Sequence, residues 1–320
     1  MADVVCFGDL LIDFVPTVTG TGLADAPAFV KAPGGAAANV AVGLARLGVP
    51  SAFMGKVGDD PFGHFLAATL QGEGVDVTPL RFEPRARTAL AFVSLRADGE
   101  REFLFYRHPS ADMLFVPAEV DVDSIRAAKA FHFDSISLAA PQPRETALHA
   151  VDVATRAGKL ISYDVNLRLP LWPDAEAAKA GLRTGLAKAQ VVKLSDDELE
   201  FLTGSREPQA VRQLWHDGLQ VVTLSRGSQG STWFTRSASH DVGTFKVEAV
   251  DTTGAGDGFM AGLLGGLLAQ PEAVKDPGAL DALCRYANAV GALTTCQRGA
   301  IPALPTRQDV ERFMVGKETP

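Results

Sequence analysis

The sequence predicts an α/β fold of three layers, in which a mostly parallel central sheet lies between two layers of helices. From residue 129 onward, short apolar runs alternate with longer segments of helical period. The apolar runs are AFHFDSI, LISYDV, QVVKLS and QVVTLS, and the segments between them are RETALHAVDVATRAG, AEAAKAGLRTGLAKA and PQAVRQLWHDG. Strands that are apolar on both faces and joined by helix-length crossovers are typical of a parallel sheet covered on both sides.

Two regions, about residues 12–33 and 86–107, have a different pattern. The second region reads TALAFVSL and REFLFYR on either side of the predicted turn 97–100. Such segments without intervening helices indicate hairpin-type strands. We expect them to form a small antiparallel sheet that acts as a lid at the carboxyl edge of the main sheet. Because no linker or repeat interrupts the chain, we expect a single domain over residues 1–320.

Composition excludes several classes of function. The chain has 38 acidic and 30 basic residues, a net charge of −8 and no basic run, so nucleic acid is not an expected partner. The three cysteines are far apart and lack the spacing of a zinc or redox site. The first residues lack a basic region, and no apolar run reaches the ~20 residues of a membrane span. We therefore expect a cytoplasmic protein that does not enter a membrane.

The motif DTTGAGDG at residues 251–258 runs directly into the helical segment FMAGLLGGLLA. Three small residues at a helix start leave backbone N–H groups convergent, which is typical of an anion site. Asp257 would lie beside a bound phosphate and accept a proton from an attacking hydroxyl group. The N–H groups of Gly254, Ala255 and Gly256 would stabilise the developing charge. The alternative is an aspartate that only stabilises the helix dipole.

A second glycine-rich segment, APGGAAAN at residues 32–39, precedes the helical run VAVGLARLGV. Gly34 and Gly35 would allow the backbone to approach a ligand closely, and Asn39 offers donors and an acceptor for sugar hydroxyl groups. The alternative is an ordinary helix start rich in small residues.

Together, these two segments resemble the two signatures of the ribokinase-like, or phosphofructokinase B, family of sugar kinases. Four further segments resemble its plant-type fructokinase branch: FGDLLIDFVP, REFLFYRHPSADMLF, SYDVNLRLPLWP and RGAIPALPT. The resemblance covers nearly the whole chain and implies a ribokinase-like α/β/α fold. It also implies ATP-dependent phosphorylation of a sugar's primary hydroxyl group, above all conversion of D-fructose to fructose 6-phosphate.

The resemblance implies a set of sugar-binding residues whose side chains or backbone groups bond hydroxyl groups. The matching positions are Asp9, Asp13, Gly34, Gly35, Asn39, Tyr106, Arg107 and Arg168. Family members that act on 2-keto-3-deoxygluconate also use tyrosine and arginine here, because a guanidinium group suits the carboxylate of that substrate. A 2-keto-3-deoxygluconate kinase therefore remains an alternative, followed by ribose and nucleoside kinases.

On the nucleotide side, residues 193–198 resemble the family's N-x-x-E element, with Ser195 in place of the asparagine. The resemblance implies that Glu198 binds Mg²⁺ through water. A helix capping box between Ser195 and Glu198 is the structural alternative. The positions that match the ATP-binding residues of the family are Lys193, Ser195, Thr223, Ser225, Gly227, Gly230, Gly256 and Asn288.

Family members often bind a monovalent cation beside the anion site through backbone oxygens. The matching positions are Asp251, Thr253, Thr294, Gln297, Gly299 and Ala303. Activation by K⁺ is therefore a hypothesis. We also expect a homodimer formed through the lid, because an exposed edge carrying LAFVSL favours association.

Two other classes of function fit the sequence less well. A sugar-binding or nucleotide-binding regulator on the same fold would be expected to lack a catalytic base, whereas this chain has Asp257. An NAD-dependent oxidoreductase needs G-x-G-x-x-G after the first strand, where this chain has Gly8-Asp9-Leu10. The sequence therefore favours a sugar kinase.

Overall fold

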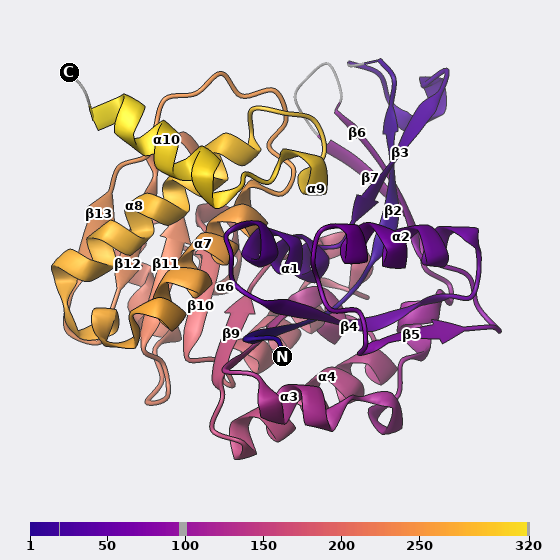
Figure 1. Cartoon of the computed structure of the whole chain (residues 1–320), viewed down its shortest axis with the longest axis horizontal. Coiled ribbons are helices and arrows are strands. Elements are labelled where there is room, and N and C mark those ends of the chain that lie inside the picture. The colour runs from indigo at the N-terminus through magenta and orange to yellow at the C-terminus, as the bar shows by residue number, and fades with distance from the viewer. Residues whose placement is uncertain (19, 96–100, 319–320) are drawn as a thin grey trace.

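The computed structural model describes residues 1–18, 20–95 and 101–318 (Figure 1), so the predicted turn at 97–100 lies outside the described residues. The strands are β1 (Val4–Phe7), β2 (Leu11–Pro16), β3 (Phe29–Gly34), β4 (Ser51–Gly58), β5 (Leu80–Glu83), β6 (Leu90–Leu95), β7 (Arg101–Tyr106), β8 (Ala130–Asp134), β9 (Leu160–Asp164), β10 (Val191–Ser195), β11 (Val221–Ser225), β12 (Ser231–Phe234) and β13 (Ser239–Val242).

The α-helices are α1 (Ala36–Arg46), α2 (Pro61–Gly72), α3 (Val122–Ala127), α4 (Pro141–Arg156), α5 (Ala175–Leu186), α6 (Asp196–Thr203), α7 (Ala255–Ala269), α8 (Pro277–Thr294), α9 (Ala300–Ala303) and α10 (Arg307–Glu318). Short 3-10 helices lie between them, and two concern the site: η2 (Ala111–Leu114) and η4 (Ser135–Leu138).

Nine strands form the main sheet in the order β13-β12-β11-β10-β9-β8-β1-β4-β5. The pairings from β11 through to β5 are parallel, whereas β12 pairs antiparallel with both β11 and β13. The antiparallel edge follows from the short connections around residues 226–230 and 235–238, which leave no room for a crossover helix. The predicted mostly parallel sheet is confirmed.

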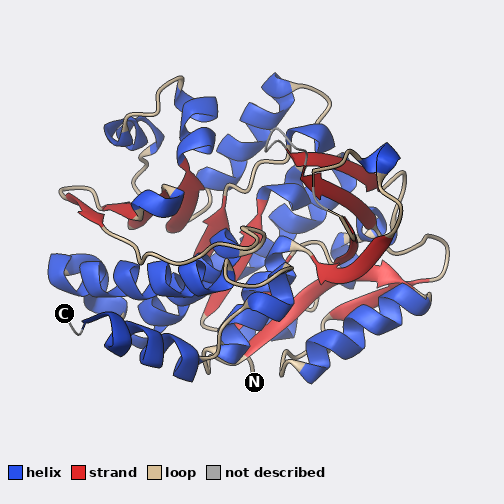
Figure 2. Cartoon of the chain, turned by 90° about the horizontal axis from the view of Figure 1, so that it is seen from above, coloured by secondary structure: helices blue, strands red, loops and turns tan. Residues whose placement is uncertain are grey.

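The main sheet separates two hydrophobic cores, because alternate residues of each strand face opposite sides. Val4 and Cys6 pack in one core with residues of α1, α7 and α8. Val5 and Phe7 pack in the other core with residues of α4 and α5. Helices therefore cover both faces of the sheet, as the view from above shows (Figure 2), and the three-layer prediction is confirmed.

The small sheet has the strand order β3-β2-β6-β7 and stands beyond the main sheet (Figure 1). Its strands come from the two predicted regions. The pairs β2–β3 and β6–β7 are antiparallel, but the central pair β2–β6 is parallel. The predicted small separate sheet with antiparallel hairpins is confirmed, and its one parallel pair is the central one, β2–β6. The two hairpins are separated by α1, β4, α2 and β5, and this long connection allows β2 and β6 to run in the same direction.

One predicted helix differs. The sequence predicts a helix over residues 208–218, but Pro208–Leu214 is a 3-10 helix and the chain then turns toward β11. Gly218 and the few residues left before β11 leave no room for a longer α-helix in this connection. Among the described residues, we find no helix with the length and apolar character that crossing a membrane would require.

Candidate active site

The candidate site lies where β1, β8 and β9 end at their carboxyl edge and where α1 and α7 begin. Asp9 follows β1, Asp134 ends β8 and Asp164 ends β9. The register pairs Asp134 with Asp164 and Phe7 with Phe133, so the three carboxylates belong to neighbouring strands. Ligands of open α/β sheets bind at this edge.

Helix α7 begins at Gly254, which has a φ of 80°, a left-handed conformation that glycine adopts readily. A Cβ atom added there would lie 2.7 Å from the Cβ of Ala300, so the turn also needs a residue without a side chain. The N–H groups of Gly254 and Gly256 donate to no other group among the described residues, whereas the N–H of Ala255 makes a long 3.3 Å bond to the carbonyl of Thr252. The helix start is therefore equipped to bind an anion.

Asp257 lies in the first turn of α7 and is half-buried. Its Oδ2 accepts a hydrogen bond from Nδ2 of Asn39 over 2.7 Å. Burial raises the pKa of Asp257, while the Asn39 bond and the charge of Lys193 oppose that rise. A carboxylate with a raised pKa beside an anion site suits a general base for a hydroxyl group.

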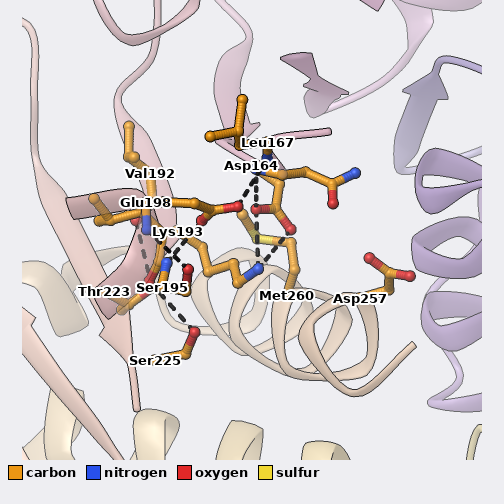
Figure 3. A network of polar contacts seen from close by, with 12 residues as sticks. Asp164, Leu167, Val192, Lys193, Ser195, Glu198, Thr223, Ser225, Asp257 and Met260 are labelled. Atoms are coloured by element: carbon orange, nitrogen blue, oxygen red, sulfur yellow. Dashed lines mark hydrogen bonds and ion pairs between the residues drawn. The ribbon is translucent and has the colours of Figure 1, made fainter. Parts of the chain in front are cut away.

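Lys193, on β10, extends beneath the start of α7. Its Nζ lies 3.0 Å from each oxygen of Asp164, and Figure 3 shows it pointing toward that carboxylate. A Cβ atom added at Gly256 would come within 2.8 Å of this ammonium group. Burial alone would lower the pKa of Lys193, but the carboxylates of Asp164 and Glu198 raise it. A buried, positively charged group therefore lies against the anion site.

Glu198 connects three segments rather than projecting freely. Its Oε2 accepts from the N–H of Ser195 over 2.7 Å, and the Ser195 hydroxyl accepts from the N–H of Glu198. Its Oε1 accepts from the N–H of Leu167 over 2.8 Å. The capping-box alternative is confirmed, and a metal would have to use the remaining lone pairs of this carboxylate.

The predicted sugar-binding residues at the start of the chain and around α1 come together. Gly35 has a φ of 117°, and a Cβ atom there would lie 2.3 Å from the carbonyl oxygen of Asp9. A Cβ atom at Gly34 would lie 2.0 Å from Oδ2 of Asp13. Burial raises the pKa of Asp9 to about 6, against the field of Arg107. Burial and the charge of Asp9 raise the pKa of Asp13 to about 7.

Both predicted arginines lie near these carboxylates. Arg107 is buried and its Nε donates to Oδ2 of Asp112 over 3.0 Å. Arg168 is half-buried, and its charge acts on Asp9, Asp13 and Asp257. The structure therefore brings both guanidinium groups close to the predicted sugar-binding carboxylates.

Tyr106 does not join them. Side chains alternate between the two faces of a strand, and β7 pairs Tyr106 with Leu90 while β2 pairs Asp13 with Ala91. Tyr106 therefore lies on the opposite face of the small sheet from Asp13, where its ring contacts Phe92 at 5.5 Å and is 57% exposed. The structure therefore does not bring Tyr106 together with the other predicted sugar-binding residues of this chain.

The predicted nucleotide-side residues gather at the ends of β10 and β11. Hydroxyl groups of Thr223 and Ser225 donate to carbonyls of β10 over 3.4 and 3.3 Å. Gly227 and Gly230 both have positive φ, and a Cβ atom at Gly230 would lie 2.2 Å from the carbonyl of Val242. Asn288 is buried and donates to the carbonyls of Val242 and Gly243, so its amide holds the end of β13 in place.

The predicted cation-binding segment is held by Asp251. Its Oδ1 accepts from the N–H and hydroxyl of Thr253, and its Oδ2 accepts from the N–H of Gly299 over 2.9 Å. Thr294 is buried and donates to the carbonyl of Val290. Gln297 is exposed, and Ala303 is buried in α9. Asp251 thus joins two of the predicted segments through its side chain.

Three residues of the site were not predicted: Asp112, Asp134 and Asp164. Asp134 and Asp164 are carboxylates that end buried strands, which is a signal that the sequence carries. Burial raises the pKa of both groups, in the case of Asp164 against the opposing charge of Lys193. Asp112 lies on a 3-10 helix with no periodic pattern, so only the structure could pair it with Arg107.

Comparisons with known proteins agree with this geometry. The chain is 51% identical to probable fructokinase-4 of Arabidopsis thaliana over 315 residues, which cover 98% of this chain and 97% of that protein. The structure of fructokinase with bound ATP from Xylella fastidiosa matches with a TM-score of 0.91 at 35% identity, over 99% of each chain. A fructokinase double mutant from Vibrio cholerae with fructose, ADP and potassium bound matches with a TM-score of 0.86 at 34% identity, over 98% of each chain.

A family model described as pfkB family carbohydrate kinase matches residues 1–307. This match spans the main sheet, the small sheet, the start of α7 and the segment held by Asp251. The chain therefore belongs to the pfkB family of carbohydrate kinases.

Proposed function

We propose that this protein transfers the γ-phosphoryl group of ATP to the primary hydroxyl group of D-fructose, giving fructose 6-phosphate. The observation that carries the proposal is the position of Asp257. Its carboxylate lies at the anion-binding start of α7 and is bonded to Asn39, a residue of α1 next to the sugar-side carboxylates. The relatives named as fructokinases support the choice of sugar.

In this reaction, Asp257 accepts the proton of the attacking hydroxyl group, and the N–H groups at the start of α7 stabilise the transferring phosphoryl group. Lys193 adds positive charge beside Gly256, and Asp164 holds the ammonium group in place. Asp9, Asp13 and Asn39 bind hydroxyl groups of the sugar. The backbone of Gly34 and Gly35 closes the pocket around them.

ATP would lie along the ends of β10 and β11, contacting Ser195, Thr223, Ser225 and the loop between Gly227 and Gly230. Magnesium is the metal that accompanies ATP phosphates in most kinases, and it would neutralise their charge. Glu198 would hold it through water, since both of its oxygens already accept backbone N–H groups. Asn288 supports this side of the site by anchoring β13.

A monovalent cation would bind beside the start of α7, with oxygens of Asp251, Thr253, Thr294, Gln297, Gly299 and Ala303 as candidate ligands. The Vibrio cholerae fructokinase double mutant, which has a potassium ion bound, supports this choice. Equal activity in sodium-only and potassium buffers would contradict it.

We further propose a homodimer through the small sheet and a cytoplasmic location. The LAFVSL segment forms β6, which lies between β2 and β7 and is therefore not the edge that the sequence predicts. The edge strand is β7, on which Leu104 and Tyr106 are 48% and 57% exposed, which is unusual for large apolar side chains on a sheet edge. The free thiols of Cys6, Cys284 and Cys296 suit a reducing compartment. Sedimentation as a monomer at micromolar concentration would overturn the dimer.

The test is coupled ADP release with magnesium and potassium, comparing D-fructose, 2-keto-3-deoxygluconate, ribose and adenosine. We expect the highest kcat/KM with fructose. A higher kcat/KM with any of the other three would overturn the choice of sugar, and turnover of none of the four would overturn the proposed activity.

A further inference from the structure

We propose that Asp112 decides which class of sugar this site accepts, because it occupies Arg107 and so prevents a carboxylated sugar from pairing with that arginine. The inference deepens the proposed function and rests on it. It concerns a residue that the mechanism above does not use.

Arg107 and Asp112 form a buried ion pair that several hydrogen bonds hold in place. Nε and Nη2 of Arg107 both donate to Oδ2 of Asp112, the former over 3.0 Å. The hydroxyl of Ser110 donates to the other oxygen, Oδ1, and thereby fixes the orientation of the carboxylate. Arg107 and Asp112 are each 7% exposed, so water competes little with these bonds. A guanidinium group held in this way has already used a pair of its donors on a carboxylate.

The surroundings of Arg107 are negative even beyond Asp112. Burial would lower the pKa of Arg107, but the charges of Asp112, Asp9 and Asp134 raise it. One buried guanidinium group therefore faces three carboxylates. The charge of Arg168 also acts on Asp9, but the donors of Arg107 are already paired with Asp112, so a carboxylate brought by a sugar acid would have to compete with Asp112 for them.

Two of the acidic side chains whose charges act on Arg107 also have unpaired oxygens. Oδ1 of Asp9 and Oδ2 of Asp134 are buried and accept no hydrogen bond from any described residue. A buried acceptor without a partner costs free energy, and a hydroxyl group is the donor that would satisfy it. Neutral sugars offer a hydroxyl group at each carbon that a sugar acid uses for its carboxylate. The arrangement therefore selects hydroxyl groups and rejects carboxylates.

The experiment measures kcat/KM for D-fructose and for 2-keto-3-deoxygluconate in the wild type and in Asp112→Asn. Asparagine keeps the shape of the side chain but removes its charge, which frees the charge of Arg107 for a substrate. We expect the ratio of kcat/KM for the acid to kcat/KM for fructose to rise at least about tenfold. The constant for inhibition of fructose phosphorylation by the acid should fall by a similar factor.

A double variant separates this role from a structural one. In Arg107→Gln/Asp112→Asn the arginine is absent, so the gain in acid preference should disappear. Asp217→Asn serves as the matched control, since the Asp217 side chain is fully exposed and pairs with Arg236 rather than with Arg107 or Asp112. An unchanged ratio in a folded Asp112→Asn protein would overturn the inference, and so would a gain that persists in the double variant.

Two further measurements keep the test independent of folding and of the proposed activity. If Asp112→Asn does not fold, Ser110→Ala keeps both charges and loosens the carboxylate, and we expect a smaller shift of the same ratio. An unchanged ratio there would then overturn the inference. If the wild type phosphorylates neither sugar, the proposed function fails by itself. Calorimetry then measures binding of the acid to the wild type and to Asp112→Asn. The inference predicts that the variant binds the acid more tightly, and equal affinity would overturn it.

Discussion

Nδ2 of Asn39 donates to Oδ2 of Asp257 over 2.7 Å, which joins the first turns of two helices through residues that lie 218 positions apart in the chain. One start carries the glycine pair of the sugar side, and the other carries the anion site. This bond holds the predicted base between the proposed sugar site and the anion site. The consequences for activity can be measured directly.

Asp257→Asn should lower kcat about a thousandfold, because general base catalysis contributes about 10²–10⁴ in rate. The KM for fructose should change little, since Asn39 and the sugar-side carboxylates remain. Coupled ADP release measures both quantities, with Asp217→Asn as an exposed control. Retention of more than about a tenth of wild-type kcat would show that another group takes the proton.

Asn39→Ala should move the acidic limb of the kcat/KM profile to higher pH. The Asn39 bond opposes the rise that burial causes in the pKa of Asp257, so its removal raises that pKa further. The base is then protonated, and inactive, over a wider range of pH. Profiles of kcat/KM from pH 5 to 9 give the pH at which the acidic limb falls separately from the maximal kcat/KM. Only the maximal value should also reflect the loss of contacts between Asn39 and the sugar. An unshifted limb would contradict the assignment of Asp257.

Lys193→Met should reduce both activity and stability. It leaves the buried Asp164 carboxylate without its partner, and breaking a buried ion pair costs about 3–5 kcal/mol. Lys193→Met/Asp164→Asn removes both charges and should recover most of the stability. The kcat should stay low in both variants, because each lacks the positive charge beside Gly256. Urea unfolding and coupled ADP release separate the two effects, and recovery of kcat in the double variant would show that Lys193 acts only on the fold.

The free energy of unfolding of the ligand-free protein should fall between about pH 5 and pH 8. Burial raises the pKa of Asp9 to about 6 and that of Asp13 to about 7, from an ordinary value of 3.8. Folding therefore binds protons in this range, and the stability that this protonation contributes is lost as pH rises through 6 and 7. Below pH 4, carboxylates with lowered pKa values, such as Asp60, become protonated, and their contribution to the free energy of unfolding is lost.

Asp13→Asn tests this pH dependence. It should flatten the slope by at most about 1.4 kcal/mol per pH unit, the equivalent of one proton. Equilibrium urea unfolding at pH 5, 6, 7 and 8 measures the slope in wild type and variant. Equal slopes would mean that the Asp13 carboxylate does not titrate in this range in the folded protein.

Much of the fold could be predicted, because the apolar strands from β8 to β11 are short, unbroken and separated by periodic helices. The site around Gly254 and Asp257 was predictable for a similar reason, since its glycines and its acid are contiguous. The parallel β2–β6 pair could not be predicted, because it depends on how two distant hairpins meet. The face of the small sheet on which Tyr106 lies depends on strand register, which the sequence does not reveal. Asp112, the partner of Arg107, lies on a 3-10 helix that no hydrophobic periodicity marks.

Only Gly8, Asp9 and Leu10 separate β1 of the main sheet from β2 of the small sheet, and only Gly35 separates β3 from α1. Both ends of the β2–β3 hairpin are therefore attached at residues proposed to bind the sugar. We therefore expect sugar occupancy and the orientation of the small sheet to be thermodynamically linked, with an equal effect in each direction. A substitution at the distal end of that hairpin should alter sugar affinity without touching the sugar.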